Sequence, residues 1–423
     1  MRTGFKRIVL IGSLLASVIL STPTAFSATI SGTKCSKVGA TKTVSSVKYM
    51  CIKSGKKIIW NKGVVIKKDP TSIPSPSPAP TKVLEPTPTA SPTPTKVAEP
   101  KVTPSPSPTA MFSPPTAPTD WNDLIKNADG ISYWAWKKSS EKISKSATKL
   151  GVIEIIMSPN ATPDNPTPLI GMNFVSRLVA NFNEPNRVKL VYVDEKDVEW
   201  GQKLIDEFCA QNACGYDVKG EAKKACNVPV TPCWGGLAVR NQQTDVPMIY
   251  VTASDWGKKD ANHVQGTLEA HEYFHNIQDK LLAQRGTGVV PRWLIEGGAT
   301  WAARAAVFNE DFAKYSAERE NNNSETLNRI KPKADWIETF LSPNYTTGWE
   351  IWNDDRYHQW NVYDVGSLAS EILVALKGPD AFMNLFKYVG EGKSFSQAFG
   401  EIYGIPWTQG AKNIAEAIVA QQR

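Results

Sequence analysis

The distribution of apolar residues predicts two kinds of secondary structure in the C-terminal part of the chain. Apolar-rich runs at 151–156, 188–193 and 248–252 are typical of strands. The segment 198–209 has helical periodicity, and beyond residue 260 the pattern becomes mainly helical. The helices predicted there span 264–284, 291–308, 312–320, 362–376, 379–389, 394–402 and 409–421. The sequence therefore predicts an α+β fold, with a mixed α/β N-terminal half and an α-helical C-terminal half.

A shorter apolar run stands at the N-terminus. Basic residues among the first seven positions precede the run 8–20, which is too short to span a membrane comfortably. Small residues at 25–28 supply a cleavage site. We therefore expect a signal peptide over residues 1–28, a protein that is secreted, extracellular or cell-wall associated, and no membrane span after signal removal. An uncleaved membrane anchor is the alternative.

The composition changes twice after this signal. Residues 29–68 contain ten lysines and no acidic residue, and short β-type runs at 48–52 and 57–60 predict a small β-rich, Cys-containing module. Proline alternates with Ser and Thr through 69–119, which favours extended polyproline II geometry and cannot pack a core. We expect a disordered linker there and a globular domain over 120–423.

The net charge is distributed unevenly among these segments. The signal carries +3, the lysine-rich module +10 and the linker zero, so the remainder carries −6 against the total of +7. The basic balance thus belongs to residues 29–68, which would hold the protein to an anionic cell-wall polymer. A solubilising lysine-rich tail is the alternative. No nucleic acid partner is expected for an exported protein.

The six cysteines suit an exported protein with disulfide bonds, and free buried thiols are the alternative. Cys35 and Cys51 are alone in the N-terminal region and are predicted to pair. Four cysteines allow three pairings, and the sequence does not choose among them. These four are Cys209, Cys214, Cys226 and Cys233.

Two of the four histidines in the chain lie four residues apart, at His271 and His275, with Glu272 between them. Residues i and i+4 share one helical face, so both imidazoles can reach one metal ion. This is the HExxH arrangement of zinc hydrolases. A catalytic zinc has three protein ligands and one open position. We expect Glu296 as the third ligand, because the small residues 297–299 would let its helix approach the first closely.

Together, the HExxH motif and the segment Trp-Leu-Ile-Glu-Gly-Gly-Ala at 293–299 resemble the gluzincin zinc metallopeptidases, nearest the aminopeptidase N-like branch. The resemblance runs from the strand near 248 to the helix near 402. It implies a zincin-like fold around a zinc cleft and one catalytic Zn²⁺ held by His271, His275 and Glu296. It also implies Glu272 as the general base that takes a proton from water.

The same resemblance implies a group that stabilises the oxyanion of the reaction. Tyr363, in Tyr-Asp-Val-Gly at 363–366, matches the Tyr-x-x-Gly of the family, whose tyrosine has this role. An ordinary tyrosine at a helix start is the alternative. Tyr357 and His358 compete for the role, since thermolysin-like relatives use a histidine.

Two further residues are candidates for supporting the metal ligands. Asp279 lies four residues after His275 and could orient its imidazole, although a solvated helix residue is an equal alternative. Thr300 stands four residues after Glu296, where thermolysin-like enzymes have an aspartate, and this difference favours the aminopeptidase-like branch. His263 is not expected to bind the metal.

These observations favour a secreted zinc metallopeptidase that hydrolyses protein or peptide substrates. No Gly-x-Met-Glu-Asn segment is found, the element that captures a free amino terminus in the aminopeptidases, so an endopeptidase is favoured slightly. The strand 248–252 is expected to hold an extended substrate along a sheet edge. The alternatives are a catalytically inactive cell-wall-binding protein with a metallopeptidase-like domain, and a zinc amidase that acts on cell-wall peptides.

Overall fold

The computed structural model describes residues 41–44, 47–54, 57–60, 64–65, 113–182, 184–227, 233, 235–330, 333–342 and 361–422. The chain divides into two compact units between Pro104 and Ser105. The predicted signal peptide and most of the predicted linker lie outside the described residues. Among the described residues, no helix combines the length and the apolar character needed to cross a membrane.

The first unit contains short antiparallel strands. They are β1 Thr41–Val44, β2 Val47–Ser54, β3 Lys57–Trp60 and β4 Val64–Val65. β2 is central and pairs with each of the other three. Cys51 in β2 is fully buried and disulfide-bonded, and Cys35, its predicted partner, lies outside the described residues.

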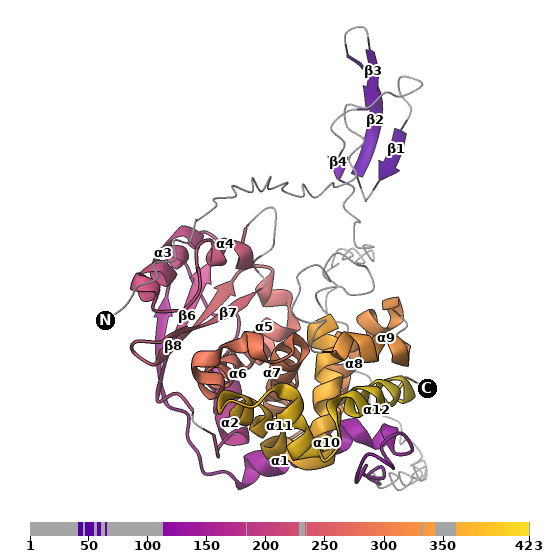
Figure 1. Cartoon of the computed structure of the whole chain (residues 1–423). Helices are drawn as coiled ribbons and strands as arrows, with labels where there is room; N and C mark the ends of the chain where they lie inside the picture. The colour runs from indigo at the N-terminus through magenta and orange to yellow at the C-terminus, as the bar shows by residue number, and fades with distance from the viewer. Residues whose placement is uncertain are drawn as a thin grey trace, which may run out of the picture. The chain divides into compact units, whose positions relative to one another are not determined.

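Four strands form the sheet of the second unit, in the order β5-β6-β8-β7. Strands β6, β8 and β7 can be followed in Figure 1. They are β5 Val152–Met157, β6 Arg187–Asp194, β7 Gly236–Asn241 and β8 Val246–Ala253. β5, β6 and β8 are parallel, and β7 is antiparallel to β8. The three predicted strands are confirmed. The expectation that 248–252 forms a sheet edge is wrong, because β7 pairs along the outer side of β8 and takes the edge itself.

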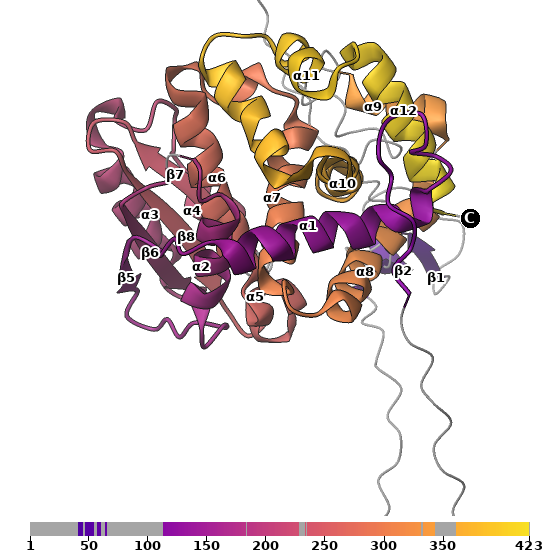
Figure 2. The same cartoon turned by 90° about the horizontal axis from the view of Figure 1, so that it is seen from below.

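The two faces of this sheet pack against different helices. Alternation along β6 turns Leu190 and Tyr192 toward the main core, which includes α1, α2 and α6 (Thr267–Leu282), and turns Val191 toward α3. These helices are labelled around the sheet in Figure 2. The helices of this half are α1 Ile131–Lys145, α2 Pro168–Leu178, α3 Val198–Phe208 and α4 Glu221–Ala225. α3 was predicted, whereas α1 and α2 were not.

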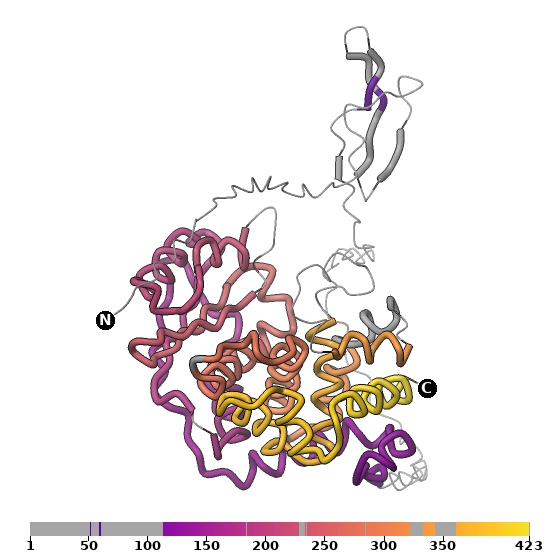
Figure 3. Tube along the Cα trace, viewed as in Figure 1, coloured from indigo at the N-terminus to yellow at the C-terminus, as the bar shows by residue number. Residues whose placement is uncertain are grey.

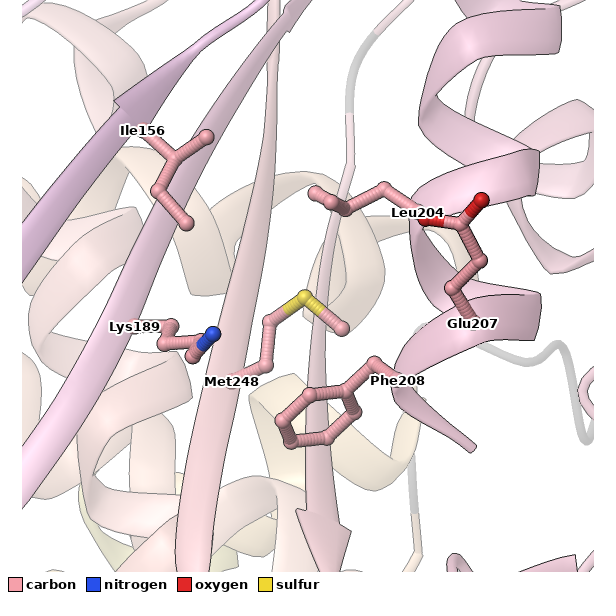
Figure 4. A pocket seen from close by; sticks show the side chains of 6 residues that line it. All are labelled: Ile156, Lys189, Leu204, Glu207, Phe208 and Met248. Atoms are coloured by element: carbon pink, nitrogen blue, oxygen red, sulfur yellow. The ribbon is translucent and has the colours of Figure 1, made fainter. Parts of the chain in front are cut away.

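Two disulfides and a small cavity lie in the part of the unit around α3. The disulfides are Cys209–Cys214 and Cys226–Cys233, so one of the three possible pairings is present. A cavity of about 210 Å³ lies between α3 and the sheet (Figure 4). Its lining residues are Ile156, Lys189, Leu204, Glu207, Phe208 and Met248. It contains none of the predicted site residues.

The second half of this unit is helical, as predicted, and its path can be followed in Figure 3. The predicted helix 264–284 is interrupted at Gly266, where φ is 82°, so it forms two helices. Gly378, with φ 81°, likewise separates the predicted helices 362–376 and 379–389 inside one continuous element. The helices are α5 Ala261–Gln265, α6 Thr267–Leu282, α7 Arg292–Val307, α8 Phe312–Ile330, α9 Ala334–Leu341, α10 Asn361–Gly390, α11 Phe395–Tyr403 and α12 Trp407–Ala420. Single 3₁₀ turns occur at Ala128–Gly130, Ala210–Asn212, Gly257–Lys259, Ala283–Arg285 and Thr287–Val289.

A close helix crossing joins α7 to α10. A Cβ added at Gly297 would lie 2.4 Å from Gly366 Cα, and one added at Gly366 would lie 2.5 Å from the Trp293 carbonyl oxygen. Real side chains cannot approach backbone atoms so closely, so both positions require glycine. The crossing brings α7 and the first turns of α10 together, which sets the distance between Glu296 and Tyr363.

The globular unit begins before the predicted linker boundary at 119. The Trp134 indole nitrogen donates to the Pro115 carbonyl at 2.8 Å, and the Asn127 amide donates to the Ala117 carbonyl at 3.3 Å. The last residues of the predicted linker therefore pack on the domain.

Candidate metal centre

Three predicted ligands meet between α6 and α7. His271 and His275 share one face of α6, and their Nε2 atoms are 3.0 Å apart. Glu296 Oε2 on α7 lies 3.2 Å from His275 Nε2 and 3.6 Å from His271 Nε2. The three side chains are only 13 to 15% exposed. Among the described residues, this is the one group of three or more His, Cys, Asp or Glu whose ligand atoms all lie within 4.8 Å of one another.

This donor set fits a zinc ion. Tetrahedral zinc with ligand bonds of 2.0–2.1 Å separates neighbouring ligand atoms by about 3.3 Å. The three observed separations of 3.0, 3.2 and 3.6 Å bracket that value. Two imidazole nitrogens and one carboxylate oxygen are also ligands that zinc prefers, and three protein ligands leave a fourth position open.

Glu272 lies between the histidines and strand β7. It is 7% exposed, and a Cβ added at Gly236 on β7 would lie 2.7 Å from its Cγ. The backbone N–H of Ala238 on β7 donates to the Glu272 carboxylate. Burial raises the pKa of Glu272, although the charges of His275 and His271 oppose this. The glycine at 236 thus lets β7, the edge strand of the sheet among the described residues, approach a buried carboxylate suited to accept a proton.

The charges of the candidate ligands shift one another's pKa values. Burial lowers the pKa of His275, but the charge and hydrogen bond of Glu296 outweigh it and raise this pKa to about 9. Burial alone would raise the pKa of Glu296, yet the two histidines hold it well below its usual range. Imidazole and carboxylate groups bind a metal in their deprotonated forms, so metal binding here would release protons.

The remaining polar atoms of the ligands also have partners. His275 Nδ1 lies 2.7 Å from Gln278 Oε1. Thr300 Oγ1 donates to the Glu296 carbonyl at 2.9 Å and lies 3.5 Å from His271 Nδ1. Arg292 Nη2 lies 3.6 Å from Glu296 Oε1, the carboxylate oxygen that faces away from the histidines. The predicted Thr300 is therefore adjacent to two ligands.

The sequence pattern pointed to Asp279, and not to Gln278, as the group that orients His275. Asp279 is within electrostatic range of His275, and burial raises its pKa. The imidazole instead donates from Nδ1 to the amide oxygen of Gln278, which is fully buried. The sequence signal for this contact was a polar residue three positions after the second histidine, within reach of its side chain on the helix.

Tyr363 lies beside the ligands, as the sequence predicts. Its ring stacks on His271, with 5.8 Å between ring centroids and 29° between planes. Its hydroxyl donates to Glu296, and burial together with the Glu296 charge raises the pKa of the phenol well above its usual value. Tyr357 and His358 lie outside the described residues. His263 is buried apart from this group and contacts Asp164 at 3.1 Å.

The fold and the site together define an α+β protein with a compact His-His-Glu centre and a buried glutamate between that centre and a sheet edge. Searches against protein-family models, curated proteins and solved structures found no match.

Proposed function

We propose that this chain is a secreted zinc metallopeptidase of the gluzincin type. The observation that carries the proposal is the meeting of His271, His275 and Glu296 at zinc-binding distances, with Glu272 buried beside them. A structural zinc site needs no adjacent carboxylate, so the position of Glu272 favours a hydrolytic enzyme over an inactive wall-binding protein.

Each residue has a chemical role in this proposal. A zinc ion bound by the three ligands would act as a Lewis acid and lower the pKa of water to about 7. Glu272 accepts a proton from the attacking water and donates it to the leaving amine. In this proposal the Tyr363 hydroxyl breaks its hydrogen bond to Glu296 and donates to the carbonyl oxygen of the substrate as that oxygen becomes negative.

The outer side of β7, which pairs with no strand among the described residues, is the proposed binding site for the substrate. An extended peptide can add to an exposed sheet edge through main-chain hydrogen bonds. Ala238 places this edge next to Glu272, so a strand bound along β7 would pass the base. The proposed substrates are therefore proteins or peptides in extended conformation, cleaved within the chain.

Residues 29–68 would hold the enzyme to an anionic cell-wall polymer.

The test is the Glu272→Gln variant of the zinc-loaded protein, with a casein-like protein as substrate. We expect hydrolysis to fall at least about 10²-fold, because general-base catalysis contributes that much or more. Zinc content, measured by elemental analysis, is expected to stay at one ion per chain. Glu391→Gln, at an exposed carboxylate, is the matched control and should cleave like the parent.

The outcomes separate the candidate functions. Undiminished cleavage by Glu272→Gln would refute the mechanism. Purified parent protein that lacks zinc and gains no activity on zinc addition would refute the metal centre. Cleavage of peptidoglycan stem peptides, with none of the casein-like substrate, would favour the amidase.

A further inference from the structure

A buried glutamine connects the two helices that supply the metal ligands. Gln278 lies on α6, three residues after His275, and is fully buried. Its Oε1 lies 2.7 Å from His275 Nδ1. Its Nε2 donates at 3.0 Å to the carbonyl of Ile295 on α7, the residue before Glu296. One side-chain amide therefore contacts one ligand and the backbone adjacent to another.

These two contacts fix the protonation of His275. A backbone carbonyl can only accept, so the amide nitrogen of Gln278 must face Ile295. The amide oxygen then faces the imidazole, and Nδ1 must carry a hydrogen. In the neutral imidazole this leaves the lone pair on Nε2, the atom that lies 3.2 Å from Glu296 Oε2. The nitrogen aimed at the candidate centre is thus the one able to bind a metal.

We propose that Gln278 is a positioning residue of the metal centre. It keeps the proton on His275 Nδ1, directs Nε2 at the metal, and ties α6 to α7 next to Glu296. This inference rests on the proposed zinc site and goes beyond its ligand set.

The neutral amide also suits the charge of the site. A carboxylate is a common partner for a metal-bound histidine. Here Glu272 and Glu296 already place two carboxylates in a buried space. A third buried negative charge would add a desolvation cost, and a carboxylate could not donate to the Ile295 carbonyl. Glutamine supplies the acceptor for His275 and the donor for Ile295 without that charge.

The first test compares zinc affinities, measured on the full chain by competition with a chromophoric chelator. We expect Gln278→Leu to weaken zinc binding by about 10- to 100-fold, the usual effect of removing a hydrogen-bond partner from a ligand. Gln202→Leu is the matched control, because its amide likewise bridges two groups, here the backbone atoms Val218 O and Ala222 N, each at 3.0 Å. Its zinc affinity should stay within about twofold of the parent, since it lies in α3 outside the site.

The second measurement reads the imidazole directly. In zinc-free ¹⁵N-histidine-labelled protein, with His275 assigned through a His275→Ala variant, spectra are recorded above the His275 pKa of about 9, where the ring is neutral. The parent ring should then carry its hydrogen on Nδ1 alone. Gln278→Leu should show a mixture of the two tautomers. A role limited to fold stability would leave the tautomer unchanged.

Gln278→Glu keeps the test decisive if Gln278→Leu does not fold. This variant retains an acceptor for His275 and loses the donor to Ile295, so it should unfold more easily while keeping the parent tautomer and zinc affinity within about tenfold. Parent tautomer and parent affinity in Gln278→Leu would overturn the inference, as would a mixture of the two tautomers in Gln278→Glu. Parent protein that binds no zinc would instead refute the proposed function.

Discussion

Buried charges in the globular unit differ in how well their surroundings compensate them. Glu296 has two histidines and Arg292 as neighbours, and its pKa is held low. Glu184, which is partly buried, is different, because the groups that donate to its carboxylate among the described residues are two neutral hydroxyls, those of Ser176 and Tyr273. Burial raises its pKa above the ordinary value, and these hydrogen bonds do not offset the burial.

Glu184 therefore predicts a pH-dependent stability. The folded protein binds this proton more tightly than the unfolded chain, so the associated stability is complete below the unfolded pKa of 4.5 and is lost as the pH rises through the folded pKa. Glu184→Gln does not titrate and escapes this loss. We expect the stability of the variant relative to the parent, measured as the difference in unfolding free energy in urea titrations, to be greater at pH 8 than at pH 4.

The control for this effect is Glu310→Gln, at an exposed carboxylate. Its difference from the parent should be the same at both pH values. A pH-independent difference for Glu184→Gln as well would show that its carboxyl has the same pKa in the folded and unfolded chain.

The candidate centre depends on three helices that meet at small residues. α6 carries the histidines and the base, α7 carries Glu296, and α10 begins at Asn361 and carries Tyr363. The crossing of α7 and α10 at Gly297 and Gly366 places their residues within reach of α6. The geometry of the site therefore depends on the distance between these helices.

Gly297→Ala tests this dependence. Helix propensity favours alanine over glycine by about 1 kcal/mol. The new Cβ would, however, lie 2.4 Å from Gly366 Cα, a backbone atom that cannot rotate away. Overpacking of this kind costs about 1–3 kcal/mol or more, so the clash outweighs the propensity gain. We expect a lower free energy of unfolding in urea titrations and weaker zinc binding in the chelator competition.

Gly288→Ala is the matched control, because a Cβ added there meets no atom within 4 Å. It should change the unfolding free energy by less than about 0.5 kcal/mol. Parent-like stability and zinc affinity in Gly297→Ala would mean that the helices can separate without moving the ligands.

At the scale of the whole molecule, the proposed metal links distant segments of the globular unit. His271 and Glu296 belong to different helices, and the unfolded chain does not hold them together. A ligand that binds only the folded state stabilises it by mass action. Metal binding and global unfolding should therefore be coupled.

Chelation and zinc addition test this coupling. Free zinc at 100 times its dissociation constant should add about 2.7 kcal/mol to the unfolding free energy. For a domain of this size we expect the Tm in calorimetry to rise by about 5 °C relative to chelator-treated protein. Glu296→Ala, which removes one ligand, should show little or no rise. An unchanged Tm in the parent would argue against a specific zinc site in the folded protein.

Local patterns accounted for much of the helical half and for three of the four strands in the large sheet. Strand β7 was missed because Gly-Leu-Ala-Val-Arg-Asn mixes small, apolar and polar residues at an edge that is only partly buried. α1 was missed because its exposed face is rich in lysine and serine and its apolar stripe is narrow. In both cases, contacts with neighbouring elements stabilise a segment whose own pattern is weak.

Local sequence patterns specify the pairing of His271 with His275 and the place of Glu272, because a helix of 3.6 residues per turn puts them together. They also specify three strands of the large sheet and the break near Gly378, which depend on neighbouring residues. Only the tertiary structure decided the distance to Glu296, the edge position of β7, the bridge from Gln278 to Ile295 and the disulfide pairing. These features join groups through the packing of whole helices and strands, and no local pattern specifies that packing.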